Sequence, residues 1–365
     1  MARDDSAPGN APPAGIWRWL PPIVLALAVG GLGGFVFERL TLPLPWMLGA
    51  MAFVTIAAVA GLRLRMPRQP RAVMITVLGV MLGSAFTPEV IARMGEWIIT
   101  FSALVLWSVL AGAVGLLYFR RVAKYDPVTA YFSSTPGGLN EMVIVGGLLG
   151  GDERIISLTH ASRVMLVVFT IPIWYRLTHD IGPAAQAARV GLLDVAPVDV
   201  AVLTLCAVIG AFGFARLRIP AAYLVGPMIL SAAAHLAGVT ASKPPYAIVS
   251  AAQVVIGTTL GCRFVGVSLA MIGHAVRHSV VTAVAMLATT ILFAWVLSQI
   301  TGYPLPALIL AFAPGGLAEM SLVALALDVD AAFVASHHIA RIVMVVILAP
   351  IAFRLMRRSG KGGES

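Results

Sequence analysis

Two copies of one short motif each place a glutamate just after a break in an apolar segment. The motif reads Pro136-Gly137-Gly138-Leu139-Asn140-Glu141-Met142, and 178 residues later Pro314-Gly315-Gly316-Leu317-Ala318-Glu319-Met320. Proline lacks an amide hydrogen and clashes with the preceding helical turn, so a helix cannot continue through either copy. Proline followed by two glycines is typical of a new half-helix, whose free N–H groups and positive dipole end can bind an anion. Each motif therefore predicts a helix start suited to an anion, with a carboxylate one turn further on.

Glu141 and Glu319 allow two interpretations. A carboxylate in an apolar segment is costly, and it indicates a proton carrier, a cation ligand or the partner of an arginine. The alternative is a glutamate that complements the positive end of its own half-helix. The breaks also have a structural alternative, a kink whose backbone groups are satisfied by neighbouring helices. Because the breaks occur at equivalent places, we favour a binding site.

An arginine and a histidine follow each motif in a later apolar segment. Arg163 and Arg341 lie near the middle of these segments, about 11 residues or roughly 16 Å from the segment start at the rise of a helix. An arginine at that depth needs a carboxylate, backbone carbonyls or an anionic substrate as its partner. His160 and His338 precede the arginines by three residues and share their helix face. We expect each His–Arg pair to face the glutamate of a broken segment, and a purely structural Glu–Arg–His contact is the alternative.

These motifs predict a duplicated solute-binding site without catalytic residues, metal or cofactor. The other histidines lack the spacing of metal ligands, and Cys206 and Cys262 lie in apolar segments as small core residues. The predicted solute-binding residues are Pro136, Gly137, Gly138, Glu141, His160, Arg163, Pro314, Gly315, Gly316, Glu319, His338 and Arg341.

The composition indicates a membrane protein. Of the 365 residues, 59% are hydrophobic and 11% are charged, whereas about 25% are charged in soluble domains. Ten apolar segments have about the length needed to cross a hydrocarbon layer of roughly 30 Å. They lie near 20–38, 43–61, 72–90, 97–119, 154–177, 198–215, 220–239, 246–268, 277–300 and 331–354. Two more, 127–150 and 305–328, contain the Pro-Gly-Gly motifs, and we expect each to enter the membrane and return.

The duplication extends over most of the chain. The same offset aligns His160 with His338 and Arg163 with Arg341, and further upstream Gly79 with Gly257. The predicted organisation is a disordered cytoplasmic tail at 1–18, a first membrane repeat at 19–178, a linker at 179–197, a second repeat at 198–356 and a basic cytoplasmic tail at 357–365. A glycine patch at 30–34 predicts close helix packing or a contact in a homodimer.

The positive charges predict that the two halves are inverted. Cytoplasmic loops of membrane proteins are enriched in Lys and Arg. Basic connectors follow the second and fourth segments of the first half, but the first, third and last segments of the second half. Five crossings per half place all of them on one side, whereas six would leave Arg216 and Arg218 outside.

The predicted fold is therefore an all-α integral membrane protein with an inverted repeat, each half having about five transmembrane helices plus one broken or re-entrant Pro-Gly-Gly segment. We expect it in the bacterial inner membrane with both termini cytoplasmic. The net charge of +9 lies in the connectors and predicts no nucleic-acid partner.

The chain resembles the AbrB-type membrane protein duplication family, in the Pro136 and Pro314 motifs and the His-x2-Arg that follows each. The resemblance covers about residues 20 to 356. Proteins of this family are labelled regulators of gene expression or ammonia monooxygenases. The family is also similar in architecture to inverted-repeat secondary transporters, which implies a transport fold but no particular substrate.

These residues are compatible with three functions, to different degrees. We favour a secondary transporter or exporter of a small anionic or zwitterionic solute, with a proton- or ion-coupled site at the repeat interface. The alternative is a non-transporting membrane regulator or sensor that affects gene expression through a partner. A redox enzyme is the weakest, because the intramembrane histidines form no compact metal cluster. The chain is accordingly predicted not to be an enzyme, with a small solute and membrane lipid as its partners.

Overall fold

The described part of the computed structural model, residues 20–178, 190–191 and 194–361, is helical and contains no strand. The predicted tail 1–18 lies outside these residues, as does most of the predicted linker 179–197. The first half comprises α1 (Leu20–Arg39), α2 (Pro45–Val59), α3 (Arg68–Gly83), α4 (Pro88–Arg93), the 3-10 turn η2 (Met94–Trp97), α5 (Ile98–Arg121), α6 (Pro127–Ser134), α7 (Leu139–Leu148) and α8 (Glu153–Thr178).

The second half presents the same order of helices, except that the single helix α12 stands in place of α4, η2 and α5. It comprises α9 (Pro197–Arg216), α10 (Ala222–Leu236), α11 (Tyr246–Gly261), the 3-10 turn η4 (Cys262–Phe264), α12 (Leu269–Thr301), α13 (Leu305–Phe312), α14 (Leu317–Ala326) and α15 (Ala331–Lys361). The bounds of α9 and α10 lie 177 residues after those of α1 and α2, and the bounds of α11, α13 and α14 lie 178 after those of α3, α6 and α7. Because α15 continues to Lys361, the backbone of the predicted tail 357–365 is helical over its first five residues.

Among the described residues, seven helices are long and apolar enough to cross a membrane: Leu20–Arg39, Pro88–Arg121, Glu153–Thr178, Pro197–Arg216, Tyr246–Phe264, Leu269–Thr301 and Ala331–Met356. They indicate a multi-pass membrane protein. The other three predicted crossings are the helices α2, α3 and α10, of 15 or 16 residues. At about 1.5 Å per residue these helices span less than a hydrocarbon core of about 30 Å.

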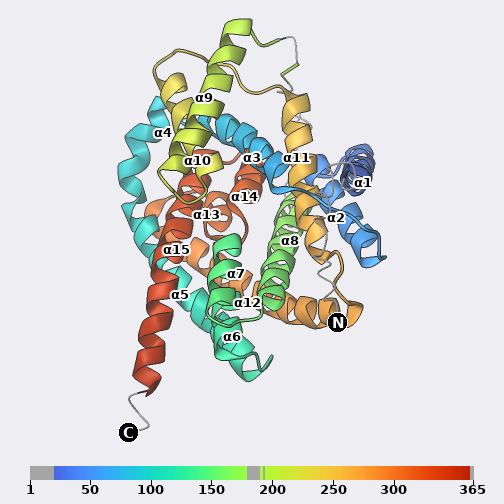
Figure 1. Ribbon diagram of the computed structural model, residues 1–365. Helices are drawn as coiled ribbons and strands as arrows, with labels where there is room; N and C mark the ends of the chain where they lie inside the picture. The colour runs from blue at the N-terminus through green and yellow to red at the C-terminus, as the bar shows by residue number, and fades with distance from the viewer. Residues whose placement is uncertain (1–19, 179–189, 192–193, 362–365) are drawn as a thin grey trace, which may run out of the picture.

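The helices pack into two bundles that combine elements of both halves. The crossed bundle contains α1, α2, α3, α9, α10 and α11, in which α3 packs on α10 and α11 packs on α2. The break bundle contains α5 to α8 and α12 to α15, with α12 packed on both α5 and α8. In Figure 1 the short helices α7, α13 and α14 lie near the centre of the molecule, beside the long helices α8 and α15.

Glycines allow the helices of the crossed bundle to meet backbone to backbone. Gly33 of α1 lies against Gly49 of α2, and the equivalent Gly210 of α9 lies against Gly226 of α10. A Cβ at any of these four positions would overlap the backbone of the facing helix. Small residues at such contacts are typical of membrane helix packing. The glycine patch thus packs against a helix of the same chain, in agreement with the predicted close helix packing.

The breaks occur where the motifs predict them. In the first half, α6 ends at Ser134 and α7 begins at Leu139; in the second, α13 ends at Phe312 and α14 begins at Leu317. Gly138 before α7 has a φ of 67°, a left-handed conformation that favours glycine, whereas Gly316 before α14 has a φ of −83°. The two copies of one motif therefore differ in backbone conformation.

Candidate functional site

A cavity of about 670 Å³ lies between the two bundles, and both breaks line it. Its volume is within the usual range of about 300–1,000 Å³ for small-molecule sites. Nine of the twelve predicted site residues line it: Gly137, Gly138, Glu141, His160, Arg163, Gly315, Gly316, Glu319 and Arg341. Pro136, Pro314 and His338 do not. The crossed bundle contributes the opposite wall through residues of α3, α9, α10 and α11 and the turns that follow α9 and α11.

In the first half, the His–Arg pair binds the carbonyl end of α6. Arg163 donates a hydrogen bond from Nη2 to the Thr135 carbonyl oxygen at 2.8 Å. His160 Nε2 lies 2.8 Å from the Phe132 carbonyl oxygen, and its Nδ1 lies 2.9 Å from Arg163 Nη2. A carbonyl oxygen can only accept, so Nε2 carries the proton and Nδ1 accepts from the arginine. The histidine is therefore neutral.

The second half repeats this arrangement. Arg341 donates to the Ala313 carbonyl oxygen at 2.7 Å and to the Gly315 carbonyl oxygen at 3.0 Å. His338 Nε2 lies 2.9 Å from the Leu310 carbonyl oxygen, while its Nδ1 lies 2.8 Å from Arg341 Nη2. Carbonyls at the end of a broken helix have no partner inside that helix. Each His–Arg pair supplies such partners, which explains why this pair follows both motifs.

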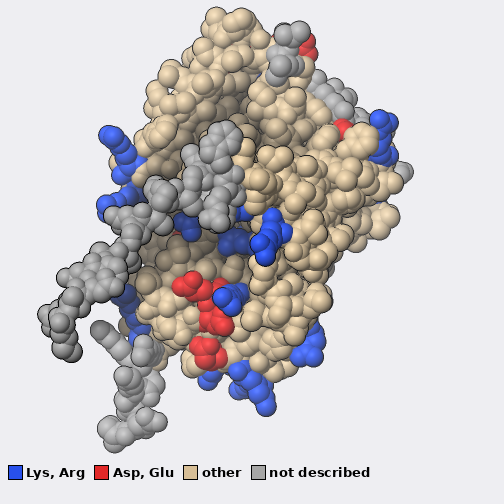
Figure 2. All heavy atoms as spheres, turned by 45° about the vertical axis from the view of Figure 1, so that its right-hand side comes forward, with Lys and Arg blue, Asp and Glu red and all other residues tan. Residues whose placement is uncertain are grey.

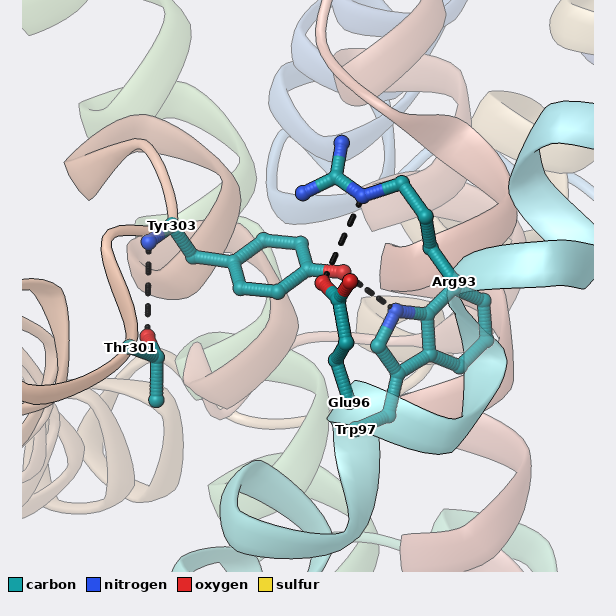
Figure 3. A network of polar contacts seen from close by, with 5 residues as sticks. All are labelled: Arg93, Glu96, Trp97, Thr301 and Tyr303. Carbon is teal, nitrogen blue, oxygen red and sulfur yellow. Dashed lines mark hydrogen bonds and ion pairs between the residues drawn. The ribbon is translucent and has the colours of Figure 1, made fainter.

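Neither arginine forms an ion pair with a motif glutamate. Among the described residues, the ion pair within 4.0 Å is Arg93 with Glu96, 3.4 Å apart on the surface (Figure 3). Beside it the Trp97 indole donates to the Tyr303 hydroxyl at 2.6 Å, and Tyr303 N donates to Thr301 Oγ1 at 3.3 Å. This network links η2 to the connector between α12 and α13, and none of its members lines the cavity.

The buried guanidinium groups keep one N–H each without a partner. Arg163 and Arg341 are 2% and 1% exposed, and the Nε atom of each has no hydrogen bond. Arg341 Nε would lie 3.5 Å from a Cβ placed on Gly137, so an arginine of the second half faces the break of the first. Its guanidinium carbon lies 5.6 Å from the centre of the Trp107 ring. These positive charges repel one another, and an anion in the cavity would stabilise both.

Glu141 and Glu319 occupy the first turns of α7 and α14. Glu319 is 6% exposed, and its carboxylate folds back over Gly316, where a Cβ would overlap it. Its place agrees with a carboxylate complementing the positive end of its own helix. Glu141 is partly exposed at the cavity. The two glutamates thus share a place in the repeat but differ in their surroundings.

Three more arginines line the cavity from the crossed bundle: Arg71, Arg218 and Arg263. They lie in or beside the basic connectors of the sequence and were not predicted as site residues. No arginine occupies the equivalent positions of the other half, so the internal repeat gives no signal for them. Arg263 donates to the Asn140 side-chain oxygen at 2.7 Å and to the Ser157 hydroxyl at 3.3 Å, which joins the crossed bundle to α7 and α8. Figure 2 shows basic side chains gathered at a depression, with acidic side chains beside them.

Comparisons with known proteins agree with the resemblance seen in the motifs. The family described as Transition state regulatory protein AbrB matches residues 46–357. The chain is 28% identical to Uncharacterized protein YhjN of Bacillus subtilis (strain 168), over 90% of this chain and 92% of that protein. It is 24% identical to Putative regulator AbrB of Escherichia coli (strain K12), over 93% of this chain and 96% of that protein. A match over most of its length shows that this chain belongs to the AbrB family.

Proposed function

We propose that the chain is a secondary transporter or exporter of a small anionic or zwitterionic solute. The observation that carries the proposal is the cavity between the bundles, which is lined by both breaks and by two buried arginines whose Nε atoms have no partner. Broken helices with their N-terminal ends at a central site are typical of secondary transporters. Glu141, partly exposed at the cavity, is our candidate for proton or ion coupling. The proposal includes no catalytic step, cofactor or nucleic acid.

We further propose that the two halves are inverted in the membrane. Arg71 in the first turn of α3 lines the same cavity as Arg263, which follows the end of the equivalent helix α11. The start of one helix thus lies near the end of its counterpart, as inversion requires. The predicted topology also places the connectors of Arg71, Arg218 and Arg263 on the cytoplasmic side. It supports an inner-membrane protein with both termini in the cytoplasm.

Flux into proteoliposomes tests the transport proposal. Purified protein should exchange radiolabelled carboxylates or amino acids, and the Glu141→Gln variant should lose coupled flux while its gel-filtration profile stays normal. The matched control is Glu153→Gln, which changes an exposed first-turn glutamate of α8 that does not line the cavity. Flux that is the same in wild type, Glu141→Gln and Arg163→Ala would refute the assigned site.

A second candidate, a membrane regulator without transport, is favoured by the names of the family and of the Escherichia coli relative. It requires a cytoplasmic surface for a partner, for which the loop from Arg63 to Arg71 and the C-terminal residues from Met356 are our candidates. Transcript profiles separate the two functions. If regulation is direct, a deletion strain is complemented by a variant that lacks flux, whereas regulation through a transported solute requires flux.

A further inference from the structure

The three arginines that line the cavity from the crossed bundle are not repeated in the other half. Arg71, Arg218 and Arg263 correspond in the other half to Val249, Thr41 and Ala85. The contacts of Arg263 with Asn140 and Ser157 likewise have no counterpart, because the equivalent positions are Ala318 and Ala335. This hydrogen-bonded group joins Arg263 of the second half to Asn140 and Ser157 of the first, and alanine stands at all three equivalent positions. The repeated fold has no arginine at any of the three equivalent positions, so the fold by itself does not explain why these three are present.

These arginines also form no close ion pair, and only Arg71 is attracted at longer range by a carboxylate, that of Glu319, among the described residues. No carboxylate lies within 4.0 Å of any of the three among the described residues. Arg71 and Arg218 make no side-chain hydrogen bond there either, and the positive charges of Arg68 and Arg71 repel that of Arg263. A cluster of like charges beside a cavity is stabilised when an anion binds among them.

The two groups of arginines differ in depth and in the bundle that holds them. Arg163 and Arg341 are buried in the break bundle beside the helix starts, whereas Arg71 and Arg263 are partly exposed and Arg218 is exposed on the facing wall. The cavity lining therefore contains five arginines against two glutamates. A single anionic group at the helix starts leaves Arg218 and Arg263 on the facing wall without a compensating negative charge.

We propose that Arg71, Arg218 and Arg263 form a second anion subsite, so that the cavity takes a small solute with two separated anionic groups, such as a dicarboxylate. The inference rests on the proposed function and names the class of its solute. One anionic group lies at the starts of α7 and α14 with Arg163 and Arg341. The other lies against the crossed bundle, so that the solute bridges the two bundles. The headgroup of an anionic phospholipid offers the same chemistry to the exposed Arg218, and the experiment separates the two sources.

Calorimetric binding to purified protein in phosphatidylcholine nanodiscs tests the second subsite. The probes are dicarboxylates from malonate to adipate, with butyrate as the monocarboxylate that matches succinate in chain length. We expect succinate to bind more tightly than butyrate. Arg71→Gln and Arg218→Gln should each lower that preference about tenfold, the usual effect of losing one charge-assisted hydrogen bond. The matched control Arg216→Gln removes an exposed arginine two residues before Arg218 that does not line the cavity, and it should leave the preference unchanged.

The outcomes separate the subsite from the site as a whole. Equal affinities for succinate and butyrate, or variants that weaken both to the same degree, would overturn the second subsite and leave the anion site at the helix starts intact. Binding of no carboxylate in the series would refute the proposed function together with this inference. In nanodiscs that also contain phosphatidylglycerol, abolition of the dicarboxylate preference would assign the three arginines to lipid headgroups and overturn the inference.

Discussion

Arginine in the middle of a membrane helix requires strong compensation, and here backbone carbonyls provide it. The guanidinium of Arg341 donates to two carbonyl oxygens of the second break and to His338, and Arg163 has a similar set of partners in the first half. The planar fork of arginine reaches several acceptors at once, which a lysine ammonium cannot do in the same geometry. The buried charge thus holds the break in place, and its Nε–H keeps no partner.

This arrangement predicts a large effect of the conservative substitution Arg341→Lys. Loss of one or more hydrogen bonds from a charged group should lower stability by about 1.5–3 kcal/mol each, seen as a lower midpoint of thermal unfolding in detergent. Arg354→Lys is the control, because Arg354 is exposed. If both variants unfold at the wild-type temperature, the carbonyl contacts do not stabilise the break.

At the same scale, residue spacing predicted part of the site. The motif glutamates and the His–Arg pairs repeat, so comparison of the two halves finds them, and nine of the twelve residues line one cavity. Among the described residues neither arginine forms the expected ion pair with a motif glutamate. Free carbonyls at the ends of α6 and α13 accept hydrogen bonds from the guanidinium groups instead. Arg71, Arg218 and Arg263 were not predicted as site residues, because the equivalent positions of the other half hold no arginine.

The helices show which sequence signals define an element and which do not. The motif offset predicts where equivalent helices begin and end, and α13 and α14 have the bounds of α6 and α7 shifted by 178 residues. The lateral pairing of α3 with α10 and of α11 with α2 was not predicted. Nearly uniform apolar faces carry little information on which helix meets which in lipid, where close packing and not hydrophobicity selects the partner.

Glycines at the crossings of α1 with α2 and of α9 with α10 therefore fix these helix pairs, and they allow a paired test. Gly33→Ala and Gly210→Ala should each destabilise the protein by about 1–3 kcal/mol, because the added methyl group overlaps the facing backbone. Gly31→Ala adds the same methyl group where no atom lies within 4 Å, and it should be neutral or stabilising, since alanine favours helix over glycine. Thermal unfolding of the three variants measures the difference. Equal midpoints would mean that the helices can separate at little cost.

At the scale of the whole molecule, duplication gives one chain two versions of each element, which have since diverged. The positive φ at Gly138 is not shared by Gly316, and Glu141 is more exposed than the buried Glu319. With inverted halves, the start of α7 and the start of α14 approach the cavity from opposite sides of the membrane. A cavity open toward one side, as in a carrier held in a single state of its cycle, would expose the two helix starts unequally.

Opposite orientation of the halves can be tested at equivalent exposed positions near the ends of α5 and α12. Arg121 and Gln299 are 178 residues apart, and both are exposed. After Cys206 and Cys262 are replaced by alanine, a cysteine at position 121 should be protected in intact cells from a maleimide that cannot cross the inner membrane, and a cysteine at position 299 should react with it. In disrupted cells both should react, which controls for local accessibility. Inversion requires equivalent residues to face opposite compartments, whereas parallel halves would place both on one side and give the two cysteines the same labelling.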